Sequence, residues 1–403
     1  MRLVSLASPM LAAWITLMTP TVSAQASLRD AFEAAWRRAP QAQAAEARAD
    51  EFAARRRAAE AFLPGPPTLG LEHSSDLVGR NEGLRKYAGE IAVPLWLPGQ
   101  KERAQAVIGA ERGAYDSAVA LARLRVAGEV RDAYWQARAA AAEVALAEAT
   151  LANLLALEAD VARRVRAGEL ARIDANRALA EAQLQRLTLA DLRARALRAM
   201  SAFRALTGLT RLPDIDEGRA GVQGATLEDH PALRAAAQSV ASLRARLAQV
   251  RGDDRDAPEL GVGTTRERTD FARPWEQIVT LRLRVPFGSE NRNRPRVAAA
   301  NVELIEAQAV HSLAALQVAA EIDSAAREVA TAEAALPLAE SRAVLALETR
   351  DLVGLGFRAG EFDLTTRLRA ERERTEADLA RARAVLESGR AVARLKQAWG
   401  ILP

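Results

Sequence analysis

The sequence repeats itself once with a period near 190 residues, and this repeat limits the possible folds more than any other feature. At an offset of 192 residues a proline and an Arg-Ala-Gly-Glu tetrad recur, and at an offset of 191 a Leu-Gly pair recurs. The matched positions are Pro94 with Pro286, 166–169 with 358–361, and 69–70 with 260–261. A period this long exceeds that of solenoid repeats, so each copy is expected to be a complete assembly of several elements.

The two copies are expected over residues 25–215 and 216–403. The one-residue change of offset places a length difference between residues 71 and 93, where we expect a hairpin loop. Each copy has the pattern of a helix, two strands, a long helix, a tight turn and another helix. The expected strands lie at about 66–73 and 87–97 in the first copy, and at about 258–267 and 276–286 in the second.

The longest uninterrupted stretches predict very long helices. Residues 100–165 contain no proline, and residues 290–356 are their counterpart in the second copy. At about 1.5 Å per residue, a helix over either stretch is roughly 100 Å long. Aromatic residues make up only 4% of the chain, whereas hydrophobic residues reach 49%. Long helices need lateral partners to bury an apolar stripe, so the pattern predicts a coiled-coil-like bundle.

The last expected strand alternates in polarity. Leu281 and Leu283 fall on one face, and Arg282 and Arg284 fall on the other. A strand of this kind separates an apolar medium from water, and its length is near that needed to cross a membrane at a tilt. After the N-terminus no segment has about 18 uninterrupted apolar residues, so we expect no transmembrane helix. Membrane insertion would therefore use strands.

Four strands are too few to close a membrane barrel, because such barrels begin at about eight strands. An open edge in lipid leaves backbone groups without hydrogen bonds. Several chains would therefore have to contribute strands to one barrel. The alternative is a small soluble sheet packed on the helices.

The first 24 residues resemble a secretory signal peptide. Arg2 supplies a positive start, residues 11–17 are mainly apolar, and Val22-Ser23-Ala24 provides small residues for cleavage after Ala24. An N-terminal anchor helix is the alternative. The chain has no cysteine, so neither a disulfide framework nor a lipid-acceptor cysteine is expected.

Charge and motif content exclude several classes of protein. The chain has 56 basic and 52 acidic residues, a near balance that argues against nucleic acid as a partner. The three histidines, His73, His230 and His311, have no second ligand at helical spacing, so no metal site is predicted. His230 precedes Pro231 and is interpreted as a residue at a helix start. No phosphate loop or nucleophile motif occurs, so we expect neither an enzyme nor a cofactor.

The mature chain as a whole resembles TolC-type outer-membrane efflux channels. The resemblance rests on the duplicated layout, on prolines that flank the hairpins, and on a turn motif present in both copies. The flanking prolines are Pro64–Pro67, Pro94, Pro258 and Pro286. The turn motif is Val165-Arg166-Ala167-Gly168 in the first copy and Phe357-Arg358-Ala359-Gly360 in the second. The missing lipid-acceptor cysteine is similar to unlipidated members, some of which serve heavy-metal exporters, and we favour that subgroup.

The resemblance implies an α+β membrane protein that forms a homotrimer in the outer membrane. It implies a twelve-stranded β-barrel that contacts outer-membrane lipid and continues into an α-helical coiled-coil barrel in the periplasm. It further implies a passive conduit for metal ions or small toxic compounds, docked onto a periplasmic adaptor protein and an inner-membrane efflux pump. Two alternatives stay open from the residues themselves: a periplasmic coiled-coil adaptor, and a structural protein without a pore.

Three groups of residues are candidates for function. The two turns are expected to form the adaptor-docking surface. In each turn a glycine in the left-handed conformation closes one helix after basic residues, and the Glu that follows is expected at the start of the next helix, matching both helix dipoles. The residues are Arg166, Gly168, Glu169, Arg358, Gly360 and Glu361. The candidates for an aperture near the turns are Asp174, Thr366 and Arg369, where the second copy departs from the family's Asp. Arg282 and Arg284 are candidates for the barrel lumen, with a solvated face as the alternative.

Overall fold

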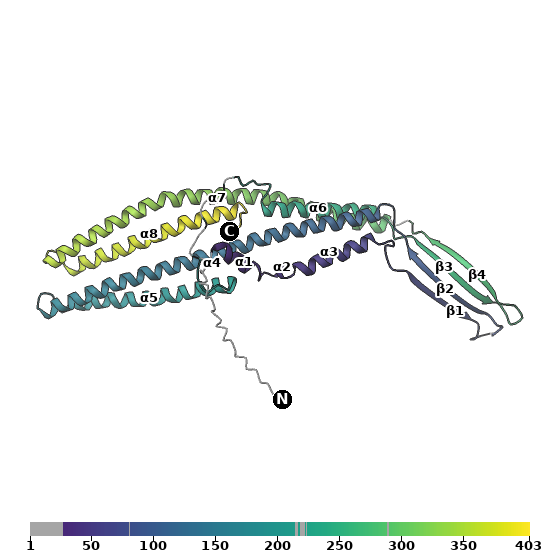
Figure 1. Ribbon diagram of the computed structural model, residues 1–403, viewed down its shortest axis with the longest axis horizontal. Helices are drawn as coiled ribbons and strands as arrows, with labels where there is room; N and C mark the ends of the chain where they lie inside the picture. Colours follow the sequence, from purple (N-terminus) through teal and green to yellow (C-terminus); the bar gives the residue numbers. More distant parts are fainter. Residues whose placement is uncertain (1–26, 80, 214–216, 218–221, 223, 288–289) are drawn as a thin grey trace, which may run out of the picture.

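The chain forms an elongated molecule with a small sheet at one end and long helices over the rest of its length (Figure 1). The computed structural model describes residues 27–79, 81–213, 217, 222, 224–287 and 290–403. The expected signal peptide lies outside the described residues. The first copy holds α1 (Leu28–Trp36), α2 (Pro40–Gln43), α3 (Ala45–Glu60), β1 (Thr68–Ser75), β2 (Arg85–Pro94), α4 (Gln100–Arg166) and α5 (Arg172–Thr207). The second holds α6 (Pro231–Gly252), β3 (Glu259–Arg268), β4 (Glu276–Arg284), α7 (Glu290–Ala359) and α8 (Leu364–Ala398).

The four strands form one antiparallel sheet in the order β1-β2-β3-β4. The middle pair joins the two copies, with Ile91 opposite Val262. The strand ends differ from the expected ranges by up to three residues. β1 begins at Thr68 because Pro66 and Pro67 have no N–H to donate to a neighbouring strand. β2 ends at Pro94 rather than at residue 97, because the chain turns there toward α4.

The helices beyond the sheet form two antiparallel hairpins. α4 packs along α5, and α7 packs along α8, while α6 lies between α4 and α7 (Figure 1). α4 has 67 residues and α7 has 70, so each is about 100 Å long. α7 contains Pro337, which removes one backbone hydrogen bond from the middle of the helix. The hairpin ends farthest from the sheet are the two turns singled out in the sequence.

Among the described residues one helix, α4, is long and apolar enough to cross a membrane by length and composition. Its apolar stretch is rich in alanine and contains charged residues, so it is not an uninterrupted apolar run of about 18 residues. Only 11% of that stretch is buried in the chain, so the stretch offers surface for packing against further helices.

A buried cluster holds the helices together at the middle of the molecule. Leu28 of α1, Tyr134 of α4 and Phe203 of α5 pack together and are almost fully shielded from solvent. Beside them Arg131 forms an ion pair with Glu217 at 2.9 Å, and both side chains are buried. Arg131 also donates to Gln397 Oε1 and to the carbonyl of Ile401. Removing one partner of such a pair costs about 3–5 kcal/mol, because the other charge is left unpaired.

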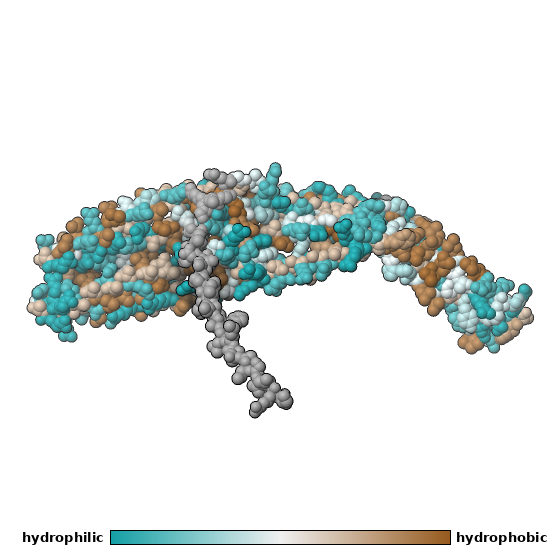
Figure 2. Space-filling model, in the orientation of Figure 1, coloured by the Kyte–Doolittle hydropathy of each residue, from teal (hydrophilic) through white to brown (hydrophobic). Residues whose placement is uncertain are grey.

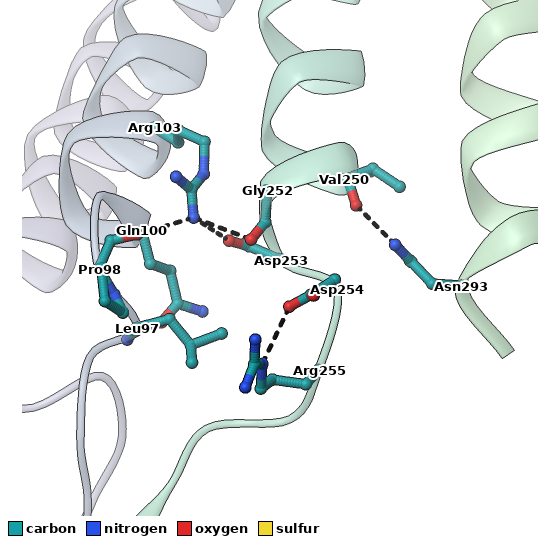
Figure 3. Close-up of polar contacts among 10 residues, drawn as sticks. All are labelled: Leu97, Pro98, Gln100, Arg103, Val250, Gly252, Asp253, Asp254, Arg255 and Asn293. Carbon is teal, nitrogen blue, oxygen red and sulfur yellow. Dashed lines mark hydrogen bonds and ion pairs between the residues drawn. The ribbon is translucent and has the colours of Figure 1, made fainter. Parts of the chain in front are cut away.

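The sheet joins the helices through a compact group of hydrogen bonds (Figure 3). Arg103, near the start of α4, donates from Nη2 to the carbonyl of Gly252 at 3.1 Å and to Asp253 Oδ1 at 3.0 Å. Asn293 of α7 donates to the carbonyl of Val250 at 3.2 Å. The end of α6 is thereby fixed to both long helices immediately before β3 begins.

His230 caps the start of α6, because its Nδ1 accepts a hydrogen bond from the N–H of Ala232 at 3.2 Å. The ring is only 3% exposed. Burial lowers the pKa of His230, although the Ala398 carbonyl and Glu321 oppose this change. Protonation of Nδ1 would also remove the acceptor for the Ala232 N–H.

We predict that His230 makes the fold sensitive to acid. In the unfolded chain His230 takes up a proton below about pH 6.5, whereas in the folded chain it does so only at lower pH. The free energy of unfolding therefore decreases as the pH falls through this window. His230→Asn, which caps without titrating, is expected to lose less thermal stability than wild type between pH 7.5 and 5.5. His311→Asn is the control and is expected to follow wild type; equal losses for all three proteins would contradict the prediction.

Candidate functional site

The sheet has one apolar face and one charged face. Because cross-strand partners share a face, the pairing of Leu69 with Ile91, Ile91 with Val262, and Val262 with Leu281 forms an apolar row across all four strands. These side chains are exposed; Leu281, for example, is 72% exposed. Figure 2 shows the resulting hydrophobic surface on the strands, between the helices and the more hydrophilic end near the hairpin loops. Exposed apolar area of this extent indicates a surface that contacts something other than water.

The opposite face carries paired charges. Arg282 donates to Glu90 Oε2 at 2.5 Å, and Arg284 donates to Glu259 Oε2 at 3.1 Å. The structure thus places both arginines on the face away from Leu281 and Leu283, in the alternation that the sequence predicts.

The Arg282–Glu90 pair spans β3, which lies between the two strands that carry these residues. A Cβ at Gly261 would lie 2.3 Å from Glu90 Oε1, so Glu90 would have to move from the position in which it contacts Arg282. This explains the sequence Gly261-Val262-Gly263. The two glycines leave space on the charged face for the ion pair, while Val262 lies on the apolar face.

Both edges of the sheet are open. Within the described part of the chain, β1 pairs only with β2 and β4 pairs only with β3. All nine residues of β4 are exposed. An edge of this kind presents a row of unpaired backbone groups that can accept another strand.

Aromatic residues lie near both ends of the sheet. Near the hairpin loops, Tyr87 lies 6.0 Å from Trp275 between ring centroids and stacks on His73 at 4.6 Å. Near the helices, Phe62 is 91% exposed and Phe287 is 90% exposed. Two aromatic belts around an apolar band are typical of membrane barrels.

The two turns at the other end of the molecule have the same backbone geometry. Gly168 has φ +81° and Gly360 has φ +82°, both in the left-handed region. In each turn the next N–H reaches back to close the helix: Glu169 donates to the Arg164 carbonyl at 2.9 Å, and Glu361 donates to the Gly356 carbonyl at 2.8 Å. Arg166, Gly168, Glu169, Arg358, Gly360 and Glu361 are all exposed.

The expected role of the glutamates at the helix starts is wrong in detail. α5 begins at Arg172 and α8 at Leu364, so neither Glu169 nor Glu361 lies in a first helical turn. Asp363 caps α8 instead, with its Oδ1 accepting from the N–H of Thr366 at 2.9 Å. Hydrogen bonding from Thr366 lowers the pKa of Asp363. The sequence interpretation missed this cap because it assumed that each helix starts directly after the turn glycine.

The two hairpin ends pack against each other. Phe357, Leu364 and Leu368 of the second copy share a buried cluster with Leu154 and Val161 of the first. Arg164 covers the cluster, with its guanidinium carbon 4.9 Å from the centroid of the Phe357 ring. It also donates to the Phe357 carbonyl at 3.1 Å and to Glu169 at 3.0 Å.

Polar contacts between α5 and α8 extend this contact between the two hairpins. Arg372 donates to Glu181 at 2.5 Å, and Arg177 donates to the hydroxyl of Thr365 at 3.2 Å. These contacts border a groove of about 750 Å³. Of the aperture candidates, Thr366 and Arg369 line the groove, whereas Asp174 does not.

Sequence reasoning did not find the Arg372–Glu181 contact, although a signal for it was present. These two residues are 191 positions apart, Arg282 and Glu90 are 192 apart, and Arg164 and Phe357 are 193 apart. All three separations match the repeat period, because the two copies lie side by side. Among the described residues, no group of three His, Cys, Asp or Glu side chains could hold a metal ion.

Solved structures match nearly the whole chain, although no family model and no curated protein matches it. CusC superposes with a TM-score of 0.75 at 15% identity, covering 93% of this chain and 92% of that one. The outer-membrane protein VceC of Vibrio cholerae gives 0.73 at 16% identity, covering 93% and 96%. The MtrE outer-membrane channel of Neisseria gonorrhoeae gives 0.70 at 18% identity, covering 93% and 89%.

The chain therefore has the fold of outer-membrane channel proteins. The structures it matches are those of TolC-type channels, and this confirms the sequence resemblance at the level of the fold.

We predict that the turn glycines are required for their backbone conformation alone. A Cβ at Gly168 or Gly360 would meet no atom within 4 Å, so only the positive φ opposes substitution. Gly168→Val and Gly360→Val are expected to loosen the last turn of α4 or α7, since the left-handed conformation costs a residue with a Cβ about 1–2 kcal/mol. Gly168→Asn and Gly360→Asn are matched controls, because asparagine tolerates this conformation. Amide hydrogen exchange at the turns measures the effect; equal exchange in the Val and Asn variants would contradict it.

Proposed function

We propose that the chain is the outer-membrane channel of a tripartite efflux pump, a passive conduit from the periplasm to the exterior. One observation carries the proposal: a sheet with an exposed apolar face and two open edges lies at the end of helices about 100 Å long. The likeness in fold to outer-membrane channels supports it.

The open edges favour closure by further copies of the chain. In this proposal, β4 of one copy pairs with β1 of the next, which is antiparallel as in the rest of the sheet. Three copies give the twelve-stranded barrel that the resemblance implies, with no free edge left in lipid. The apolar face contacts outer-membrane lipid, and the charged face with Arg282 and Arg284 lines the lumen.

The helical hairpins of three copies would continue the barrel as a coiled-coil tunnel through the periplasm. Their exposed apolar side chains, such as Leu187 of α5 and Leu316 of α7, would be covered in such a tunnel. The turns then lie farthest from the membrane and form the docking surface for the adaptor and the inner-membrane pump. Asp174, Thr366 and Arg369 lie near this end and would border the aperture. The Val and Asn variants of the turn glycines test docking, because only the Val variants should lose export while trimers persist.

The substrate class is proposed from the resemblance alone: metal ions or small toxic compounds, with heavy-metal efflux as the favoured subgroup. A periplasmic adaptor or a structural coiled coil fits less well. A structural coiled coil needs no sheet, and an adaptor needs a single helical hairpin. The described residues hold two hairpins joined to a sheet with segregated faces.

We predict that the protein closes its sheet as a trimer. Chemical crosslinking in native membranes should give no species larger than three chains. Without crosslinker, the trimer should dissociate on heating in detergent. A sample that is heated in detergent before the crosslinker is added is the control for crosslinking by random collision. A monomer with the full strand content by circular dichroism would contradict the proposed closure.

We also predict opposite accessibility for the two faces of β4. The chain has no cysteine, so single Cys substitutions can be labelled without background. In native membranes a water-soluble maleimide should label Arg282→Cys and Arg284→Cys, but should label Leu281→Cys and Leu283→Cys only after solubilisation and unfolding. The reason is that only the charged face lines an aqueous lumen. Equal labelling of all four variants before unfolding would refute the assignment.

A further inference from the structure

Three arginines lie on the apolar face of the sheet, at the level of the aromatic belt near the hairpin loops. Arg85 lies opposite Arg268 and forms an ion pair with Asp76, so the two arginines of interest are Arg266 and Arg268. Arg266 pairs with Tyr87 across β2 and β3, so it shares the face of Val262 rather than that of Glu90. Arg268 is two residues further along and lies on the same face. Both guanidinium groups lie over the ring of Trp275, with Arg266 at 5.2 Å and Arg268 at 5.1 Å from the centroid.

Neither guanidinium has a carboxylate partner among the described residues. Arg268 makes one hydrogen bond, from Nε to the Gly83 carbonyl at 3.3 Å, and no hydrogen bond or ion pair of Arg266 is seen. The nearby strand acids, Glu267 and Glu276, lie opposite each other on the charged face, away from these arginines. The other arginines of the sheet all have acidic partners, namely Arg85 with Asp76, Arg282 with Glu90, and Arg284 with Glu259.

Two neighbouring guanidinium groups without a carboxylate partner are suited to bind an anion from outside the chain. A guanidinium binds a phosphate through two parallel N–H···O bonds, which is the strongest hydrogen bonding available to arginine in proteins. Contact with the Trp275 ring holds both side chains in place, so less entropy is lost on binding. Aromatic belts lie at the level of lipid headgroups, which is where lipid phosphates lie.

We infer that Arg266, Arg268 and Trp275 form a binding site for the phosphate of a lipid headgroup in the outer leaflet. The inference rests on the proposed function, because it requires the apolar face to contact lipid. Each chain of a trimer carries one such site. The site orients the barrel in the membrane, since these arginines are on the loop end of the sheet and the opposite belt has Phe62 and Phe287 instead.

Native mass spectrometry of the full-length trimer in dodecyl maltoside tests the inference. The probe is diphosphoryl lipid A, compared with the same lipid after phosphatase treatment and with inorganic phosphate. We expect up to three diphosphoryl lipids per trimer, little binding of the dephosphorylated lipid, and no displacement by inorganic phosphate at equal concentration. The double substitution Arg266→Gln and Arg268→Gln should weaken binding about tenfold or more, because it removes both charge-assisted contacts.

Two further variants make the result specific. Arg266→Lys with Arg268→Lys keeps the charges but removes the planar fork, and should bind with intermediate affinity. Arg273→Gln removes an exposed loop arginine outside the site and should bind like wild type. The inference is overturned if the Gln double variant binds like wild type, if the dephosphorylated lipid binds equally, or if inorganic phosphate displaces the lipid.

The same preparation separates this inference from the proposed function. If trimers form and conduct in planar phosphatidylcholine bilayers but show no preference for the phosphorylated lipid, the inference alone fails. If neither trimers nor conductance is found, the proposed function fails, and the lipid site fails with it.

Discussion

The sheet cannot satisfy its own hydrogen bonds, and this constraint shapes the rest of the structure. β1 and β4 are edge strands in the described chain, and the apolar face beside them is exposed to whatever surrounds the protein. Neither feature is stable for a lone chain in water, because open edges recruit other strands and bare apolar surface recruits other apolar surface. In the proposed assembly, copies of the same chain close the open edges and lipid covers the apolar face.

The repeat made much of this architecture predictable. Two copies of one pattern predicted two hairpins of helices and a sheet of four strands, and prolines and glycines placed the breaks. Strand ends such as residues 95–97 were less predictable, because the turn into α4 depends on how Arg103 meets Gly252 rather than on residue type. A single sequence also could not show that Arg131 and Glu217 meet, since their 86-residue separation matches no period.

Contacts between the two copies could have been predicted from the repeat. Residues that face each other across the two copies are separated by nearly the repeat period, as with Arg372 and Glu181. The repeat could therefore have identified such pairs in advance, if the copies were known to lie in parallel. The cap at Asp363 could not be predicted from the repeat. The two turns share a tetrad, but the helices after them start with different residues.

The glycines of β3 have a consequence for what a solute would meet inside the proposed barrel. Because Gly261 lets Glu90 reach Arg282, charges of opposite sign neutralise each other across a strand in the middle of the charged face. Nearer the hairpin loops, Glu267 and Glu276 lie opposite each other on the same face and have no ion pair among the described residues. Three copies would repeat this arrangement around the wall, so a ring of carboxylates at the loop end would attract cations and repel anions, whereas the wall below it would be nearly neutral.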